Sequence, residues 1–162
     1  MRLVLVVLFA FLAVACSSPV IERRPKVLTF SCEEKLQELC ADSLAEWNLA
    51  LAGTDTSLMF TTEEDADYRV ENLFGTKGEC TKGTMHWAGC CFPPSQGYQG
   101  LILLDPSSWH GTDEPDAYAL GVLLHEIGHA LGLGHQEEGI MFPVMRKATS
   151  VDPYTTSLIR SR

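Results

Sequence analysis

Three histidines and a glutamate stand close together near the end of the chain, in the eleven-residue stretch HEIGHALGLGH that begins at His125. On a helix, which advances about 100° per residue, His125 and His129 lie on one face a single turn apart, so both imidazoles can reach one metal ion. If the helix continued, His135 would lie roughly 9 Å further along the axis and about 240° around from His129. The helix must therefore end before His135.

Gly132 stands where a helix would end with a residue in the left-handed conformation, and Gly134 gives the chain further freedom to turn back. His135 is then predicted to arrive as the third ligand. Three neutral imidazoles leave one position of a tetrahedral zinc ion open, which distinguishes a catalytic zinc site from a closed structural one. The alternative is that the histidines are ordinary helix-surface or core residues, but the full spacing favours the metal site.

Glu126 is predicted to be the general base of this site. It lies about 100° around the helix from His125, so its carboxylate points past the ligands toward the open position. Zinc lowers the pKa of a bound water from about 15.7 to about 7, and Glu126 can accept its proton and later deliver it to a leaving amine. The residues therefore indicate metal-assisted hydrolysis.

The composition predicts one globular domain. The chain has 162 residues, of which 46% are hydrophobic and 20% are charged, so it can bury a core. Its formal net charge is −9. Such an acidic chain lacks the electrostatic footprint of a protein that binds nucleic acid.

The N-terminal residues indicate export. The apolar run from Leu3 to Ala15 follows Arg2 and has the length of a signal-peptide core rather than of a membrane span. The residues that end at Cys16, LAVAC, resemble a bacterial lipoprotein box, although Ala13 stands where leucine is usual. We expect lipid on Cys16 and attachment to the bacterial cell envelope; secretion after Ala15 and an uncleaved anchor are the alternatives. The predicted division is a signal peptide over 1–15, a tether over 16–26 and the domain over 27–162.

The order of the predicted elements is that of an α+β fold. A capping-box pattern from Ser31 to Glu34 predicts the start of a long amphipathic helix that ends at Gly53. Asp113 is the predicted N-cap of a second helix that runs to about Leu131, and Asp152-Pro153 opens a third. Strands are predicted over residues 27–30, 56–61, 68–74 and 101–104, with a weaker, edge strand over 84–92.

Six cysteines in an exported protein argue for disulfide bonds. Cys32 and Cys40 both fall in the first predicted helix, where they would be roughly 12 Å apart. A disulfide needs Cα atoms within about 7 Å. We therefore expect no bond between these two; each would pair with one of Cys80, Cys90 and Cys91. If Cys16 carries lipid, one thiol is left unpaired.

The site resembles that of the metzincin zinc peptidases, through the eleven-residue motif and the methionine that follows it in Ile140-Met141-Phe142-Pro143. Pro143 stands where astacins and serralysins usually carry tyrosine, which favours the matrixin branch. The resemblance implies the metzincin fold, a small twisted mixed sheet with a long helix, an active-site helix and a C-terminal helix. It also implies that Met141 lies beneath the histidines; ordinary core packing of Met141, or of Met145, is the alternative.

The resemblance covers most of residues 27–162, including Trp47-Asn48 in the first helix and Ala66 to Val70 in the third strand. It implies that the strand over 84–92 binds extended peptides along its edge; a solvent-exposed loop held by disulfides is the alternative. The cysteine-switch prosegment of matrixins has no counterpart, since Ser17 to Lys26 is too short. The spare thiol could cap the zinc instead, or be merely unpaired.

Many matrixins also hold structural zinc or calcium. The side chains that could bind such ions here are also explained as solvated loop residues or helix caps, so the sequence does not locate a second metal site. They are His86, His110, Asp105, Asp113 and Asp116.

These observations predict an exported zinc endopeptidase that acts on proteins or peptides, is tethered to a membrane by lipid and is monomeric. Two alternatives keep the metal site: a tethered zinc-containing binding or inhibitor-like protein that cleaves nothing, and a zinc amidase that acts on a non-protein substrate such as a cell-wall cross-link. Glu126 disfavours the binding protein, which needs no general base.

Overall fold

The structure, a computed structural model, describes residues 27–73, 81–82, 85–86, 88–95, 97–144 and 147–161. The predicted signal peptide, the tether and Cys16 lie outside these residues. Within the described part of the chain, no helix is both long enough and apolar enough to cross a membrane.

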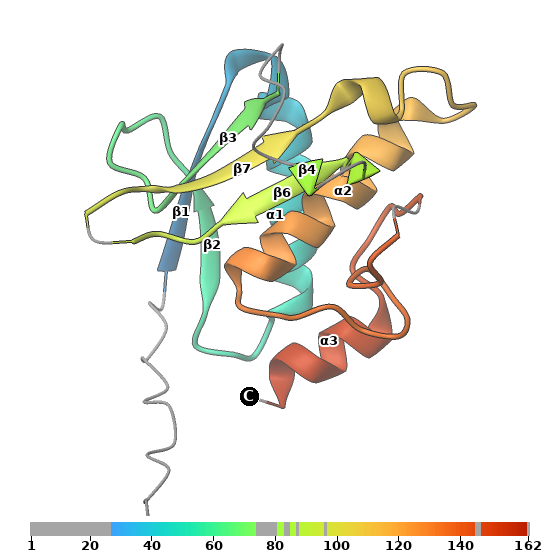
Figure 1. Ribbon diagram of the computed structural model, residues 1–162. Helices are drawn as coiled ribbons and strands as arrows, with labels where there is room; N and C mark the ends of the chain where they lie inside the picture. Colours follow the sequence, from blue (N-terminus) through green and yellow to red (C-terminus); the bar gives the residue numbers. More distant parts are fainter. Residues whose placement is uncertain are drawn as a thin grey trace, which may run out of the picture.

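A five-stranded mixed sheet forms one layer of the domain (Figure 1). Its strand order is β2-β1-β3-β7-β6; the first four strands are parallel, and β6 at the edge is antiparallel to β7. Two short strands form a separate antiparallel pair. The strands are β1 (Val27–Cys32), β2 (Ser57–Phe60), β3 (Tyr68–Asn72), β4 (Thr81–Lys82), β5 (Met85–His86), β6 (Gly89–Phe92) and β7 (Gly100–Leu104).

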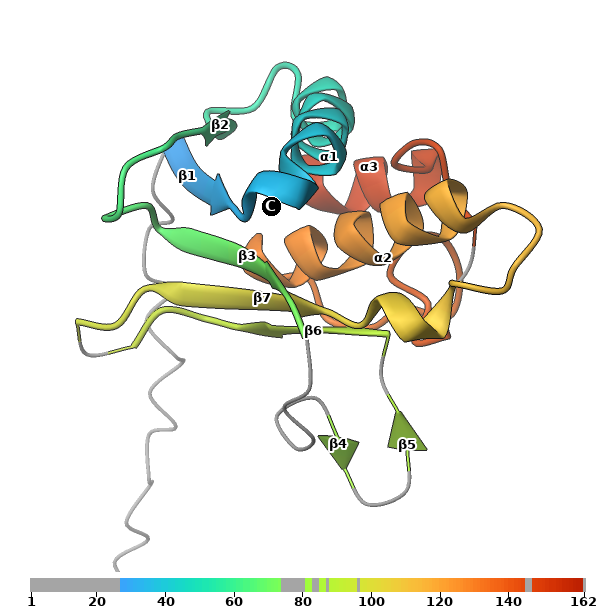
Figure 2. The ribbon, with the colours of Figure 1, turned by 90° about the horizontal axis from the view of Figure 1, so that it is seen from above.

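The helices cover one face of this sheet (Figure 2). They are α1 (Gln37–Ala50), α2 (Pro115–Ala130) and α3 (Pro153–Arg160), with short 3-10 turns η1 (Glu34–Leu36) and η2 (Pro106–Ser108). Helix α1 packs on α2, and α2 lies beside β6 and β7. The predicted α+β metzincin fold is therefore confirmed, with the long helix, the motif-bearing helix and the C-terminal helix all in place.

The core lies between the sheet and the two longer helices. Its largest fully buried side chains come from the sheet, from α1 and α2, and from the segment after the motif: Phe30, Trp47, Ile102, Leu104, Leu123, Leu124, Ile127 and Met141. Trp47 also satisfies its polar group, because its Nε1 donates a hydrogen bond of 2.9 Å to the carbonyl of Leu124. This bond fixes α1 against α2 one residue before the first histidine of the motif.

The prediction for the start of the first helix is wrong. Strand β1 continues through Cys32, which pairs with Val70, and the amide of Glu33 donates to the carbonyl of Val70 at 3.0 Å. Glu33 is not part of a capping box; its carboxylate accepts a hydrogen bond from the amide of Asn72 at 3.0 Å. Cys32 and Glu33, which the local pattern assigns to the helix, therefore pair with β3 instead.

The disulfide prediction fails for the same reason. Cys32 ends a strand instead of opening a helix, so its Cα lies 6.7 Å from that of Cys40, and the two form a disulfide bond. Cys90 is also disulfide-bonded. Among the described cysteines, Cys91 has a free thiol.

Of the two predicted N-caps for α2 and α3, only that of α3 is confirmed. Asp152 caps α3 as predicted, since its carboxylate accepts a hydrogen bond from the amide of Thr155 at 2.9 Å. Asp113 does not cap α2: Glu114 holds the N-cap position without a side-chain bond. The carboxylate of Asp113 instead accepts from Lys147 at 3.0 Å, because the segment after the motif folds back over the start of α2.

Candidate active site

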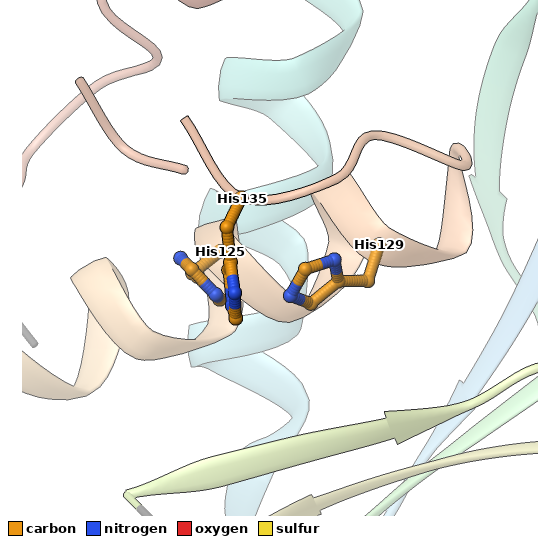
Figure 3. Close-up of side chains that lie close together, drawn as sticks. All are labelled: His125, His129 and His135. Atoms are coloured by element: carbon orange, nitrogen blue, oxygen red, sulfur yellow. The ribbon is translucent and has the colours of Figure 1, made fainter. Parts of the chain in front are cut away.

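The three histidines of the motif meet at the C-terminal end of α2. His125 and His129 lie one turn apart on the helix, and His135 reaches them from the segment that follows (Figure 3). One nitrogen atom of each ring can be chosen so that all three lie within 4.8 Å of one another. The side chains are therefore close enough for one metal ion to bind all three.

Gly132 makes this arrangement possible by ending the helix. Its φ of 76° is in the left-handed region, which residues with a Cβ rarely adopt. The amide of Gly132 donates to the carbonyl of His129 at 2.7 Å, and that of Leu133 donates to Gly128 at 2.9 Å. These two bonds form a Schellman motif, after which the chain turns back and carries His135 to the other two rings.

Two backbone carbonyls orient the helical histidines. The Nδ1 of His125 is 2.7 Å from the carbonyl oxygen of Ile140, and the Nδ1 of His129 is 2.8 Å from that of Leu133. A carbonyl oxygen can only accept, so each Nδ1 carries the proton and donates. The Nε2 of each ring is then left as the basic nitrogen that a metal requires.

The electrostatic surroundings keep these rings neutral. Burial, against the opposing effect of the bond to Ile140 and with smaller contributions from His129 and His135, lowers the pKa of His125 to about 4. Burial also lowers the pKa of His129. Since zinc binds the neutral imidazole, the protonation state, the tautomer and the grouping of the rings all fit a zinc ion.

Glu126 lies between α2 and the edge strand β6. Its side chain is only 5% exposed. A Cβ built on Gly89 of β6 would lie 3.0 Å from both the Cγ and an Oε1 of Glu126, so the strand backbone passes directly against this side chain. Burial raises the pKa of Glu126 to about 8. A carboxyl group with a pKa near neutrality can both take up and return a proton.

Met141 follows Ile140 and is fully buried. Gly128, on the helix between His125 and His129, faces its thioether: a Cβ on Gly128 would overlap the Met141 sulfur and lie 3.2 Å from the ring of Trp47. The carbonyl of Met141 accepts from the amide of Gln136 at 2.9 Å, which ties the turn to the segment that carries His135.

Within the described residues, the three histidines are the one group of three or more His, Cys, Asp and Glu side chains placed to hold a metal ion. The residues considered for further ions have other surroundings. Asp105 caps η2 through the amide of Ser107 at 3.0 Å. Asp113 pairs with Lys147, while His110 and Asp116 are exposed. The side chain of His86 lies outside what the structure describes.

Three residues that shape the site were not predicted from the sequence: Gly89, Gly128 and Ile140. Gly128 carried a usable signal, because a glycine in the middle of a helix lowers helix stability by about 1 kcal/mol relative to alanine and needs a compensating reason. Gly89 and Ile140 carried none, because their roles depend on which distant segments pack against them.

The comparisons with known proteins agree with this geometry. The matrixin family model matches residues 24–156, which is most of the chain. No curated protein matches the sequence. The matched region includes the sheet, the motif-bearing helix, the three histidines and Met141. The chain thus belongs to the matrixin family of zinc metallopeptidases.

Proposed function

We propose that this protein is a zinc-dependent endopeptidase in which His125, His129 and His135 hold the catalytic zinc and Glu126 is the general base. Membership of the matrixin family supports the general activity. The observation that carries the assignment is the position of Glu126, a nearly fully buried carboxyl group one residue from a histidine of the group. A protein that only stored zinc would gain nothing from burying an acid there, since burial of an unpaired carboxylate is costly.

Each residue of the site has a separate role in hydrolysis. The Nε2 atoms of the histidines would hold the zinc, which when bound acidifies water and polarises a carbonyl group. Glu126 would take the proton from the attacking water and deliver it to the nitrogen of the leaving amine. Ile140 and Leu133 keep the rings in the required tautomer through their carbonyl groups. Met141 supports the rings from below.

The edge strand β6 supports a peptide substrate. None of the other described strands pairs with its outer edge, and Gly89 on this strand adjoins Glu126. An extended peptide that adds to the outer edge of β6 would form backbone hydrogen bonds with this strand and lie close to Glu126 and the histidines. Backbone recognition of this kind favours proteins and peptides as substrates.

The test compares the protein with Glu126→Gln and with a matched control, Glu137→Gln, which changes an exposed glutamate just beyond the motif. We expect one zinc ion per chain in all three proteins. Cleavage of an unfolded protein such as casein should fall by roughly 10²-fold or more in Glu126→Gln alone. Loss of zinc in Glu126→Gln would contradict the role of Glu126. Zinc without casein cleavage in the parent would favour a non-catalytic protein or an amidase with another substrate.

We also propose that the protein is exported and anchored through lipid on Cys16. The apolar run before Cys16 and the box-like residues LAVAC support this. Replacement of Cys16 by Ser should move the protein from the membrane fraction to the soluble fraction of the cell envelope. An unchanged distribution would contradict a lipid anchor.

A further inference from the structure

The carboxylate of Asp152 joins the C-terminal helix to the turn beneath the histidines. Its oxygens accept hydrogen bonds from the amide of Thr155 at 2.9 Å, the hydroxyl of Thr155 at 2.8 Å and the amide of Ile140 at 2.7 Å. The first two bonds cap α3. The third crosses to a different part of the chain, which capping does not require.

The turn is built to admit this carboxylate. Gly139, the residue before Ile140, has a φ of 75°. A Cβ at Gly139 would lie between 2.6 and 2.9 Å from the atoms of the Asp152 carboxyl group. The backbone conformation of Gly139 therefore disfavours a side chain there. The close approach of Asp152 also leaves no space for one.

Ile140 links Asp152 to the metal site. Its amide donates to Asp152, while its carbonyl oxygen accepts from the Nδ1 of His125 at 2.7 Å. One residue thus has its two backbone polar groups fixed, the first by a charged acceptor and the second by a zinc-ligand candidate. Charged acceptors form stronger hydrogen bonds than neutral ones, so Asp152 is an effective anchor for this residue.

Helix α3 is fastened at its other end as well. The Nε of Arg160 donates to the carbonyl of Ala50 at 2.9 Å, and its Nη2 donates to that of Leu49 at 3.3 Å. These carbonyls belong to the last turn of α1, whose own Trp47 is bonded to α2. The helix therefore connects the turn beneath the histidines to the rigid core.

We propose that Asp152 is a positioning residue for the zinc site: it holds Ile140 in place, and Ile140 orients the ring of His125. The proposal rests on the proposed function, in which His125 is a zinc ligand. Partners that orient a ligating histidine typically contribute 10- to 100-fold to metal affinity. Asp152 acts on His125 indirectly, through Ile140, so we expect its effect on zinc affinity to be at about the lower limit of that range.

The experiment measures the zinc dissociation constant by competition with a chromophoric chelator, in the protein and in two variants. Asp152→Ser keeps a hydroxyl that can cap α3 but is too short to reach Ile140. The matched control, Thr155→Val, removes another donor to the same carboxylate and leaves the bond to Ile140 intact. We expect zinc to bind about 10-fold more weakly to Asp152→Ser and within about 2-fold of the parent to Thr155→Val.

A second readout separates orientation from general destabilisation. The Nδ1 proton of His125 should be protected from solvent exchange in the NMR spectra of the zinc-loaded parent and of Thr155→Val, and should exchange faster in Asp152→Ser. If Asp152→Ser does not fold, Asp152→Asn replaces it, since the neutral amide oxygen is a weaker acceptor for the amide of Ile140 than the charged carboxylate. Equal zinc affinities in parent and variant would overturn the positioning role alone. Absence of zinc from the parent would overturn the proposed function and this role together.

Discussion

Met141 packs against the backbone of Gly128 so closely that a Cβ on this glycine would overlap the methionine sulfur. Gly128 lies on α2 between His125 and His129, and Met141 follows the turn that bonds to His125. The helix face that carries Gly128 is therefore in direct contact with the segment that carries Met141. The small size of Gly128 is what allows this contact.

Gly128→Ala tests the contact. Alanine would stabilise an exposed helix by about 1 kcal/mol relative to glycine, but overpacking of a buried site costs about 1–3 kcal/mol. Because Met141 and Trp47 are both fully buried and cannot move aside freely, we expect the overpacking cost to lie in the upper part of its range. The net loss in the free energy of unfolding, measured in urea, should then be about 1–2 kcal/mol. Gly111→Ala, where a Cβ would meet nothing within 4 Å, should stay within about 0.5 kcal/mol of the parent. A Gly128→Ala protein more stable than the parent would refute the argument.

The parts of the fold that depend on local chemistry could be predicted from the sequence. The end of α2 at Gly132 and the start of α3 at Asp152 each involve residues within a few positions of one another. The start of α1 could not be predicted, because Cys32 and Glu33 have two competing partners: the helix that follows, and β3. Pairing with the sheet prevails, and the error in the cysteine pairing follows from it.

The site shows the same division. The spacing of the three histidines is a property of one helix and one turn, so the sequence is sufficient to predict that they meet. The contact between Gly89 and Glu126, and the two hydrogen bonds of Ile140, join segments that are distant in the sequence. No periodicity or motif specifies such contacts, because they depend on how the sheet, α2 and α3 pack together.

Gly89→Ala should reduce catalysis without loss of zinc. The new Cβ would lie 2.8 Å from the Cγ1 of Val122 and 3.0 Å from the Oε1 of Glu126, which must shift to make room. Small displacements of catalytic groups lower the rate of reaction strongly, so we expect kcat/KM on a peptide substrate to fall roughly 10-fold. The zinc content should remain at the parent's level, because the atoms nearest to the new Cβ belong to Val122 and Glu126 and not to a histidine. A variant that loses zinc and activity together would show that the change disrupts the packing of β6 instead.

Cys91 should be an unreactive thiol. It is partly buried on β6 and packs against the core. Burial, with a smaller effect of the Glu126 carboxylate, raises the pKa of Cys91 to about 12. The thiol therefore stays protonated at neutral pH, and at pH 8 its thiolate population is roughly 10³-fold below that of an ordinary cysteine.

Alkylation with iodoacetamide, followed by mass spectrometry, checks this prediction. The native protein should be labelled at Cys91 far more slowly than the urea-unfolded protein. Without a reductant, Cys32 and Cys40 should remain unlabelled in both, because they are joined in a disulfide bond. Rapid labelling of Cys91 in the native protein would contradict its burial.

Asp152 should make the stability of the fold depend on pH in the acidic range. Burial alone would raise the pKa of Asp152, but the hydrogen bonds from Thr155 and Ile140 outweigh it, so the pKa lies below its usual value. A carboxyl group with a lower pKa in the folded state contributes stability above the unfolded-state pKa, about 3.9, and loses it as the pH falls through the folded-state value.

The comparison of the protein with Asp152→Asn in urea, at a series of pH values and with zinc removed from both by a chelator, isolates this contribution. The difference in the free energy of unfolding should be constant from neutral pH to about pH 5 and should shrink below about pH 4. Asparagine cannot ionise, so any part of the difference that comes from shape alone persists at low pH. A difference that does not change with pH would mean that the charge of Asp152 contributes nothing. The turn beneath the histidines would then be held by shape and neutral hydrogen bonds.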